Sequence, residues 1–465
     1  MIFSMDEILK ATEGKLLQGE RDVLFQGIST DSRTVREGEL FIALKGAHFD
    51  GHPYALEALG KKAGGVLIEE AKAGDFRWNG YRPKAVVAVK DTLQSLGDLA
   101  RSRRRGYKTS VVGVTGSNGK TTTKEMIAAC LQTSLPVLKS KGNFNNLIGL
   151  PLTLLGLTGE EKVAVLELGM NVTGEIRRLT EISEPDVGLI TNIQRVHLEG
   201  TGSLENVAEE KGTLFRGMRQ DGTIVVNRDD PRVVALAHSF PGRKVTFGVK
   251  GQADVMAKGV RLKGEGTSFL LIAGGKEMEV FLPLLGKQFV SNALSAVAVA
   301  ALFGIDANQA KEALEHYRAF PMRMEVCHLQ GGRTLIDDSY NANPVSMELA
   351  LETLAEIKGR GRAIAVLGDM LELGEFSEEA HLRLGQKIKE CAIDLVILLG
   401  EKAPIVVASA VRHGLEPERV RVVKSHSEAL VLLHQLSREG DWILVKGSRG
   451  MTMEKIAGVM KEGRA

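Results

Sequence analysis

A short run of glycines, hydroxyls and one lysine, Val114 to Thr123, constrains the fold of this chain more than any other feature. The apolar segment Ser110–Val114 predicts a buried strand before it, and apolar residues at helical spacing from Met126 to Leu131 predict a helix after it. Glycines at such a turn let backbone N–H groups point at an anion on the helix N-terminus. We therefore expect Gly116–Gly119 to bind phosphate.

Two side chains that follow the glycines extend this phosphate site. Lys120 supplies a positive charge, and the hydroxyl of Thr121 is a suitable ligand for Mg2+. The run departs from the common phosphate-loop pattern, because Val114 stands where a glycine is usual and Gly113 comes one residue too early. The sequence thus predicts a variant class of nucleotide-binding loop that uses Mg2+.

Length and charge limit the other possibilities. A chain of 465 residues exceeds one ordinary core, so we expect three domains. The net charge of +2, from 60 basic and 58 acidic residues, provides no global field that favours nucleic acid, and we expect no such partner. The short basic run Arg101 to Arg105 is interpreted as a solvated linker.

Cysteine usage and hydropathy indicate the compartment. The three cysteines are far apart and lack metal-ligand spacing, which indicates neither a disulfide framework nor a zinc site. Met1–Lys10 carries acids and no long apolar core, so we expect no signal peptide. Because no apolar run is long enough to span a bilayer, we expect no membrane insertion. We predict a cytoplasmic protein, and a monomer by default.

Strand and helix signals divide the chain into three α/β regions. Residues 1–105 form a small α/β module, and residues 106–319 alternate strands and helices as in a mostly parallel, doubly wound sheet. Residues 320–465 repeat this rhythm, so we expect a Rossmann-like open sheet with ligand groups at the strand C-termini. The expected strands are Leu40–Leu44, Gly65–Ile68, Ala85–Val89, Ser110–Val114, Val163–Leu168, Val187–Ile193, Thr223–Val226, Thr334–Ile336, Ile364–Leu367, Leu395–Leu399, Val420–Val423 and Ile443–Val445, and the expected helices include Thr92–Ala100, Asn292–Leu302 and Gln309–His316.

Two polar residues follow strands of the central region. Glu167 ends the strand Val163–Leu168, and His197 comes just after Val187–Ile193. Each alone can be an ordinary polar residue at a strand end, or it can face the crevice where the phosphates lie. Their joint position beside a phosphate loop favours Mg2+ ligation.

Other polar residues permit two interpretations each. Lys211 is by default a surface lysine on a helix, and Asn292 can simply cap one. Asp337–Pro344 is either a helix-initiating turn or a binding loop after an apolar strand. Gly368–Gly374 and Lys446–Gly450 each follow a buried strand, so a substrate cleft at that sheet edge is favoured over plain turns.

These segments together resemble the Mur ligase family over nearly the whole chain. Thr115–Thr122 looks like the family's ATP loop, and Ser29–Arg33 with Asp50–His52 resembles its UDP-sugar module. No Asp-Asn-Pro-Arg motif of the kind found in many MurE enzymes is present. The stretches that resemble the members adding D-alanyl-D-alanine are Asn143–Gly149, Asp338–Pro344, Gly368–Gly374 and Val445–Arg449.

The resemblance implies an ATP-dependent ligase of peptidoglycan precursor synthesis. Such an enzyme joins D-Ala-D-Ala to UDP-MurNAc-tripeptide through an acyl phosphate, and its third domain closes over the cleft. ATP contacts are implied for Thr115, Gly116, Ser117, Asn118, Gly119, Lys120, Thr121, Thr122, Asn292, Arg323 and Asp338. UDP-sugar and peptide contacts are implied for Ser32, Arg33, His52, Asn143, Asn145 and Asn146. A dipeptide cleft is implied for Tyr340, Asn341, Asn343, Asp369, Glu372, Lys446, Ser448 and Arg449.

The same resemblance implies that four residues are catalytic: Lys120, Glu167, His197 and Lys211. Thr121, Glu167 and His197 would hold Mg2+, and Lys211 matches a lysine that is often carbamylated to a bridging carboxylate. The alternative within this chemistry is a MurE-type or folylpolyglutamate-type ligase that adds a single amino acid. A P-loop kinase or a non-catalytic nucleotide switch is the alternative from another class, but it leaves the polar loops of the third region unexplained.

Overall fold

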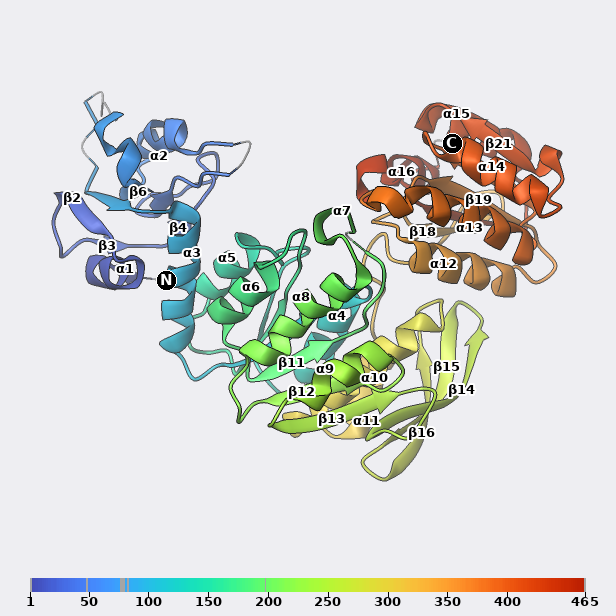
Figure 1. Cartoon of the computed structure of the whole chain (residues 1–465), viewed down its shortest axis with the longest axis horizontal. Coiled ribbons are helices and arrows are strands. Elements are labelled where there is room, and N and C mark those ends of the chain that lie inside the picture. The colour runs from blue at the N-terminus through green and yellow to red at the C-terminus, as the bar shows by residue number, and fades with distance from the viewer. Residues whose placement is uncertain (1, 47–48, 76–79, 82, 197, 464–465) are drawn as a thin grey trace.

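The structure is a computed structural model that describes residues 2–46, 49–75, 80–81, 83–196 and 198–463. Within these ranges the strands form sheets of five, nine and six strands and one two-stranded pairing. Figure 1 shows three bodies: the blue first body and the red third body lie on either side above the green and yellow second body. Each large sheet lies within one of the predicted ranges 1–105, 106–319 and 320–465, which remain our proposal for the domain limits.

A five-stranded sheet organises the first body. Its elements are β1 (Phe3–Ser4), α1 (Met5–Thr12), β2 (Lys15–Gly19), β3 (Leu24–Phe25), β4 (Ile28–Ser29), β5 (Leu40–Ile42), α2 (Ala55–Gly60), β6 (Gly65–Glu69), β7 (Ala85–Val89) and α3 (Thr92–Arg105). The strand order is β2-β7-β6-β5-β4, and only the edge strand β2 is antiparallel to its neighbour. The strands β5, β6 and β7 are buried on both faces, which explains their continuous apolar sequences.

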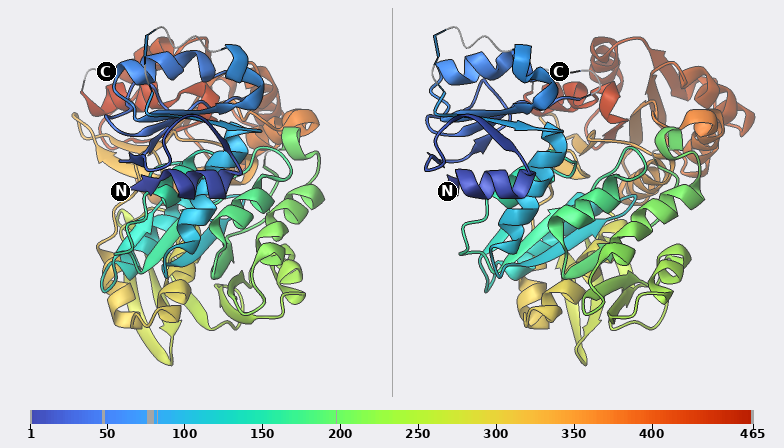
Figure 2. Two further views of the ribbon diagram at one scale, coloured as in Figure 1. Left: turned by 90° about the vertical axis from the view of Figure 1, so that its left-hand side faces the viewer. Right: turned by 60° about the vertical axis from the view of Figure 1, so that its left-hand side comes forward.

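Helix α3 joins the first body to the second, as its light-blue ribbon shows in Figure 2. Its buried residues Leu96, Leu99 and Ala100 belong to one apolar core that also contains Phe3 of the first body and Leu150 of the second. A shared core fixes the two bodies against each other, because separating them exposes this apolar surface to water.

The basic run at the end of α3 is not a solvated linker, so that interpretation was wrong. Arg101 and Arg105 pair with Glu184 at 2.9 and 2.5 Å, and Arg104 pairs with Asp186 at 2.9 Å. Both acids come from the second body, about eighty residues further along the chain. The run therefore forms the last helical turn and docks it on the second body.

A nine-stranded sheet organises the second body. Its elements are β8 (Ser110–Thr115), α4 (Lys120–Leu131), β9 (Val137–Lys139), α5 (Gly149–Leu155), β10 (Val163–Glu167), α6 (Glu175–Ser183), β11 (Val187–Ile190), α7 (Leu198–Thr201), α8 (Leu204–Gly217), β12 (Thr223–Asn227), α9 (Pro231–His238), β13 (Arg243–Gly248), β14 (Val255–Lys263), β15 (Gly266–Ala273), β16 (Lys276–Leu282), α10 (Gln288–Leu302) and α11 (Ala307–Glu315). The strand order is β16-β15-β14-β13-β12-β11-β8-β10-β9.

The predicted doubly wound sheet is confirmed for the strands β8 to β13, which are all parallel. Alternate residues of each strand face opposite layers: Val112 packs with the core of α4 and α10, and Val111 with that of α5, α6 and α8. Strands β14 to β16 extend the sheet as an antiparallel meander that the sequence analysis did not predict.

A six-stranded sheet organises the third body, in the order β17-β18-β22-β19-β20-β21. Only the edge strand β17 is antiparallel, so the expected Rossmann-like sheet is confirmed. Its elements are β17 (Glu325–His328), β18 (Thr334–Asp338), α12 (Pro344–Ile357), β19 (Ala363–Gly368), α13 (Ser377–Glu390), β20 (Leu395–Leu399), α14 (Ala403–Arg412), β21 (Val420–Val423), α15 (His426–Leu436), β22 (Trp442–Lys446) and α16 (Glu454–Lys461).

Strand β18 is longer than predicted, because it continues through Asp337 and Asp338. The two carboxylates are accommodated in a buried strand by lysines from distant segments. Lys461 lies 2.6 Å from Asp337, and Lys446 lies 2.5 Å from Asp338. In the part of the chain that the structure describes, no helix combines the length and the apolar character needed to cross a membrane.

Candidate active site

The phosphate loop joins β8 to α4 and depends on two glycines with left-handed backbone. Gly116 has φ +144°, and a Cβ there would lie 1.9 Å from Thr191 Oγ1. Gly119 has φ +80°, and a Cβ there would lie 2.7 Å from Asn292 Oδ1. Only glycine fits both positions, because a side chain would be strained and would also clash.

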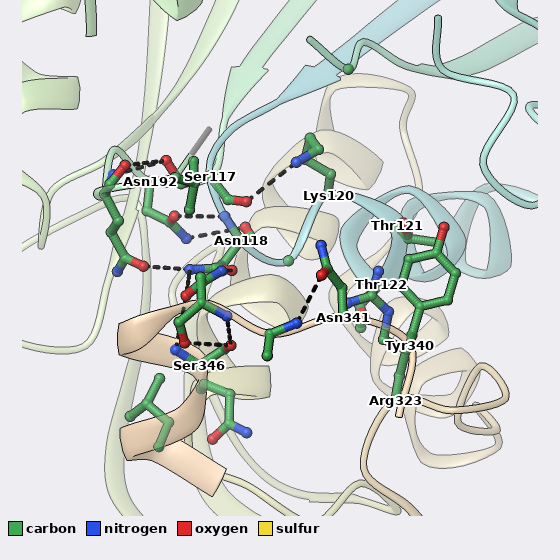
Figure 3. A pocket seen from close by; sticks show the side chains of 18 of the residues that line it. Ser117, Asn118, Lys120, Thr121, Thr122, Asn192, Arg323, Tyr340, Asn341 and Ser346 are labelled. Atoms are coloured by element: carbon green, nitrogen blue, oxygen red, sulfur yellow. Dashed lines mark hydrogen bonds between the residues drawn. The ribbon is translucent and has the colours of Figure 1, made fainter. Parts of the chain in front are cut away.

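The loop is anchored to the segment that follows β11. The backbone N–H of Asn118 donates to Asn192 Oδ1 at 3.0 Å, and its carbonyl accepts from Thr191 Oγ1 at 2.6 Å. The Ser117 hydroxyl donates to the Gln194 carbonyl at 3.0 Å and accepts from the Gln194 N–H at 2.8 Å. These bonds, several of which Figure 3 marks, hold the loop in one conformation. Of these partners, Thr191, Asn192 and Gln194 were missed by the sequence analysis, although they form a polar run directly after a strand.

Lys120 begins helix α4 and points back toward its own loop. Its ammonium donates to the carbonyls of Gly116 and Ser117 at 2.9 and 3.2 Å. Burial lowers the pKa of Lys120, the charge of Glu167 opposes this effect, and the charge of Arg323 adds to it. A lysine so placed carries its charge beside the anion-binding backbone of the loop.

Glu167 ends β10 and leaves one carboxylate oxygen available. Its Oε1 accepts from Asn145 Nδ2 at 2.9 Å, whereas Oε2 is buried and has no donor among the described residues. A buried carboxylate oxygen without a partner is costly and suits a cation, and Thr121 lines the same cavity. No group of three acidic, histidine or cysteine side chains with metal-binding geometry occurs in the described ranges. His197, the third predicted Mg2+ ligand, lies outside the described residues.

Lys211 is a buried residue of α8 and not a surface lysine, so the default interpretation was wrong. Only 1% of the residue is exposed. Burial and the charge of Lys120 place its pKa well below the usual lysine range, although Glu210 opposes them. Its amine is therefore a candidate for neutral, nucleophilic chemistry.

A cavity of about 870 Å³ lies between the second and third bodies. The phosphate loop lines it together with Arg323, Tyr340 and Asn341, and Figure 3 shows these residues. The predicted site residues that line it are Ser117, Asn118, Gly119, Lys120, Thr121, Thr122, Asn143, Asn145, Asn146, Glu167, Asn292, Arg323, Asp338, Tyr340, Asn341, Asn343, Glu372, Lys446, Ser448 and Arg449. Thr115, Gly116, Lys211 and Asp369 do not line it, and Ser32, Arg33 and His52 lie in the first body.

Three loops of the third body meet at the cavity. The buried Lys446 ammonium donates to Asp338 Oδ2 at 2.5 Å and to the Asn341 carbonyl at 2.9 Å. Burial lowers the pKa of Lys446, and the charge of Asp338 opposes that shift. Ser448 Oγ accepts from the Leu371 N–H at 2.8 Å, which links the loop after β22 to the loop after β19. Hydrogen bonds thus connect the loops at this edge of the sheet to one another.

Cationic side chains flank one aromatic ring in the cavity. The Arg323 guanidinium lies 4.0 Å from the Tyr340 ring centroid, and that of Arg449 lies 5.6 Å from it. Arg323 comes from the segment before β17, whereas Tyr340 follows β18. Two positive charges in the lining of this cavity favour anionic ligands.

Several predicted contact residues have partners within the protein. Both Asp369 carboxylate oxygens accept from the Lys402 N–H, at 3.3 and 3.1 Å, and Asp369 does not line the cavity. His52 bonds Asp50 Oδ1 through Nδ1 at 2.5 Å and accepts from the Glu69 N–H through Nε2 at 3.0 Å. These bonds make a direct ligand contact by Asp369 or His52 less favourable, because the ligand would have to displace them.

The other predicted residues of the UDP-sugar module also bond locally. Arg33 makes a bidentate ion pair with Asp31, from Nε to Oδ1 at 2.9 Å and from Nη2 to Oδ2 at 2.7 Å. The Ser32 hydroxyl donates to Glu57 Oε2 at 3.1 Å. Arg33 remains largely exposed, with 82% of its side chain accessible, so it is available to a ligand. Ser32, Arg33 and His52 therefore remain predictions as UDP-sugar contacts.

Comparisons with known proteins agree over nearly the whole chain. The model for the Mur ligase family catalytic domain matches residues 24–104, the Mur ligase middle domain matches 114–300, and the Mur ligase glutamate ligase domain matches 322–449. The UDP-N-acetylmuramoyl-tripeptide–D-alanyl-D-alanine ligase of Bacillus subtilis is 37% identical over 97% of both chains. A crystal structure of MurF from Acinetobacter baumannii superposes with a TM-score of 0.90 at 30% identity over 99% of both chains. The MurF ligase of Thermotoga maritima in complex with ADP superposes with a TM-score of 0.83 at 29% identity, over 96% of this chain and 99% of that one.

Proposed function

This chain belongs to the Mur ligase family, and on that premise we propose that it joins D-Ala-D-Ala to UDP-MurNAc-tripeptide in an ATP-dependent reaction. The products are UDP-MurNAc-pentapeptide, ADP and phosphate. The observation that carries the proposal is the cavity in which a phosphate loop faces the polar loops of a second α/β body. A kinase or a nucleotide switch does not need that second set of loops.

The reaction forms an amide in two steps. The carboxylate of the tripeptide attacks the γ-phosphorus of ATP, which breaks the bond to ADP and forms an acyl phosphate. The amine of D-Ala-D-Ala then attacks the acyl carbon, loses a proton and displaces phosphate. The first step brings two anions together, so its rate depends on positive charge at the transferring group and on alignment of the reactants.

The phosphate loop supplies positive charge and alignment for the first step. The N–H groups of Gly116–Gly119 would donate to the phosphates. The Lys120 ammonium, which donates to two carbonyls of its own loop in this structure, would turn from them toward bound ATP. Arg323 adds a second cation from the third body. Asn292, whose Oδ1 abuts Gly119, supports the loop from α10 and is our proposed adenine-side contact.

Mg2+ fits the carboxylate at the end of β10. Glu167 would hold it through the buried oxygen that has no donor among the described residues, with Thr121 from α4 and His197 as the further ligands. The bound ion would neutralise charge between the attacking carboxylate and the triphosphate. Asn145 keeps the other oxygen of Glu167 in place and thus orients the carboxylate.

Lys211 is our proposed site of carbamylation. Its amine attacks the carbon of CO2 and loses a proton, which yields a carbamate, and the low pKa supports a neutral amine that can do so. The product is a carboxylate-like group where Lys120 supplies a nearby positive charge. It would be a bridging anion in the catalytic site, in line with the resemblance of Lys211 to the family's lysine.

The two peptide substrates approach the cavity from different bodies. We assign the UDP-sugar to the first body, near Ser32, Arg33 and His52, and the tripeptide end to Asn143, Asn145 and Asn146. We assign the dipeptide to Tyr340, Asn341, Asn343, Glu372, Lys446, Ser448 and Arg449, with Asp369 as a support for the neighbouring loop. We place the reaction in the cytoplasm, where ATP is available, and propose that the enzyme acts as a monomer.

Phosphate release by the purified chain tests the proposal. The assay contains Mg-ATP and UDP-MurNAc-tripeptide, with D-Ala-D-Ala present or absent, and parallel samples with single amino acids or with folate and glutamate. We expect release that requires both peptide substrates and a pentapeptide product by mass. Release with a single amino acid would replace the proposal by a MurE-type or folylpolyglutamate-type reaction, and release without any amine would indicate a kinase or a switch.

A further inference from the structure

Helix α4 contains a buried lysine that the reaction described above does not use. Lys124 lies one turn after Lys120, and none of its surface is exposed to solvent. Its ammonium donates to the Ser140 carbonyl at 2.6 Å and to the Gly142 carbonyl at 3.2 Å, and it lies 2.9 Å from Glu125 Oε1. The three acceptors match the three N–H bonds of the ammonium.

An ammonium at such a depth is costly unless every donor is satisfied. A leucine or methionine would fill the same space without that cost, so the charge calls for a reason beyond packing. The two carbonyls that accept from Lys124 indicate such a reason. They belong to the turn that begins the segment Ser140–Ile148, which we call the asparagine loop. Lys124 thus ties the helix that starts at the phosphate loop to the start of the asparagine loop.

The asparagine loop in turn holds Glu167. Asn145 Nδ2 donates to Glu167 Oε1 at 2.9 Å, and the Ser140 hydroxyl accepts from the Glu167 N–H at 3.3 Å. The Gly169 N–H donates to the Asn145 carbonyl at 2.7 Å, which keeps the loop against the end of β10. A continuous set of bonds therefore leads from Lys124 through the loop to the Glu167 carboxylate, which lines the same cavity as the phosphate loop.

We infer that Lys124 is a positioning residue for the reaction: it fixes the asparagine loop, and through it Asn145 and Glu167, relative to the phosphate loop. The inference rests on the proposed ligase function for its kinetic consequence, but its structural content does not depend on that function. Because α4 carries Lys120 at one end and Lys124 one turn later, one helix sets the positions of both the phosphate site and the peptide side of the cleft.

Lys139 provides a matched control for the kinetic test. It also pairs with Glu125, at 2.5 Å from Oε2, but it forms no bond to the asparagine-loop carbonyls and is 38% exposed. Lys124→Met and Lys139→Met remove the same charge from the same carboxylate. We expect kcat/KM for UDP-MurNAc-tripeptide to fall at least about tenfold in Lys124→Met, since small displacements of aligned groups are costly, and to stay within about twofold in Lys139→Met. KM for ATP should stay within about twofold in both variants, because the phosphate loop keeps its own anchors.

Hydrogen–deuterium exchange of the intact protein tests the structural part. In Lys124→Met the amides of residues 143–149 should exchange faster than in the wild type, while those of β8 and β10 keep their protection. A merely space-filling Lys124 would leave both the exchange and kcat/KM at the wild-type level, and that result overturns the inference. A wild type that fails to make pentapeptide would overturn the proposed function. The exchange experiment would still test the role of Lys124 in that case, because it needs no substrate.

Ser140→Ala covers the case in which Lys124→Met does not fold. This variant removes the hydroxyl that accepts from the Glu167 N–H, but it leaves the carbonyl bonded to Lys124 and buries no unpaired charge. We expect a wild-type melting temperature and a loss of about threefold or more in kcat/KM, the value of one weak hydrogen bond. Unchanged kinetics in Ser140→Ala together with an unfolded Lys124→Met would overturn the inference.

Discussion

Asn118 of the phosphate loop and Asn343 at the start of α12 exchange side-chain hydrogen bonds across the cleft. Asn343 Nδ2 donates to Asn118 Oδ1 at 2.6 Å, and Asn118 Nδ2 lies 3.3 Å from Asn343 Oδ1. The two residues are 225 positions apart in the chain and belong to different bodies. Since Asn118 also donates to Gln194 Oε1 at 2.5 Å, the pair connects the third body to the anchored phosphate loop.

Asn343→Asp should weaken this connection without removing the helix cap. The carboxylate still accepts from the Ser346 N–H, as Asn343 Oδ1 does at 3.0 Å, but it has no donor for Asn118. We expect kcat for pentapeptide formation to fall about two- to tenfold, the value of one hydrogen bond, with an unchanged melting temperature. Asn343→Ala, which also lacks the cap, should in addition lose about 1 kcal/mol of stability. An aspartate variant with wild-type kcat would show that the pair has no part in turnover.

Lys120→Ala should abolish ATP turnover and leave the fold intact. The bonds of its ammonium to described residues go to two carbonyls of its own loop, so the variant leaves the bonds that anchor the loop to the segment after β11 in place. We expect phosphate release to fall at least about 100-fold, because a cation at the transferring phosphoryl group is removed. Phosphate release is measured beside a thermal melt of the same sample. Turnover at the wild-type rate with a normal melt would contradict the assignment of the phosphate loop.

Lys211 should carry a carbamate when bicarbonate is present. The wild type exchanged into 13C-bicarbonate should give a carbamate carbon signal that is absent from Lys211→Gln, and the variant should lose most of its ligase activity. Both the signal and the activity should decrease as the pH falls, because acid returns the carbamate to amine and CO2. A signal that persists in Lys211→Gln would assign the modification to another amine.

His381 should make stability depend on pH. It is buried, its Nε2 accepts from the Met370 N–H at 3.1 Å, and burial lowers its pKa below the usual 6.5. The folded state then binds fewer protons than the unfolded state. The contribution of neutral His381 to the free energy of unfolding is therefore present above about pH 6.5 and is lost as the pH falls through the folded-state pKa. The charges that act on the imidazole are those of Asp369, which opposes the shift, and of Lys402, which adds to it.

A series of thermal melts between neutral and mildly acidic pH checks this expectation. The melting temperature of the wild type should fall as the pH is lowered. The melting temperature of His381→Gln should be lower at neutral pH and should change less with pH. His434→Gln is the control, since that histidine is exposed on α15. Parallel profiles for the wild type and His381→Gln would exclude His381 as the group responsible.

Much of the fold follows from local pattern. The phosphate loop, the parallel strands and the binding edge of the third sheet were predicted from short apolar runs and the polar residues after them, and the strands Leu395–Leu399 and Val420–Val423 have the predicted limits. Such signals are local, because strand periodicity and turn residues act over a few positions. The position of Glu167 at the end of β10 was predicted in this way, since the last residue of a buried strand in a parallel sheet lies at its ligand edge, and its role as a metal ligand stays a prediction.

Other features depend on partners that are distant in the chain. Lys211 and Lys124 look like ordinary helix lysines in the sequence, and neither can be identified as buried before α8 and α4 are packed. The end of α3 resembled a linker because Glu184 and Asp186, which neutralise it, come from another body. The sequence by itself determined the position of the phosphate loop and of the predicted parallel strands, because these follow from spacing along the chain. Only the tertiary structure decided which charges are buried, which acids pair with α3 and that Asn118 meets Asn343, because burial and pairing are set by surfaces that folding brings together.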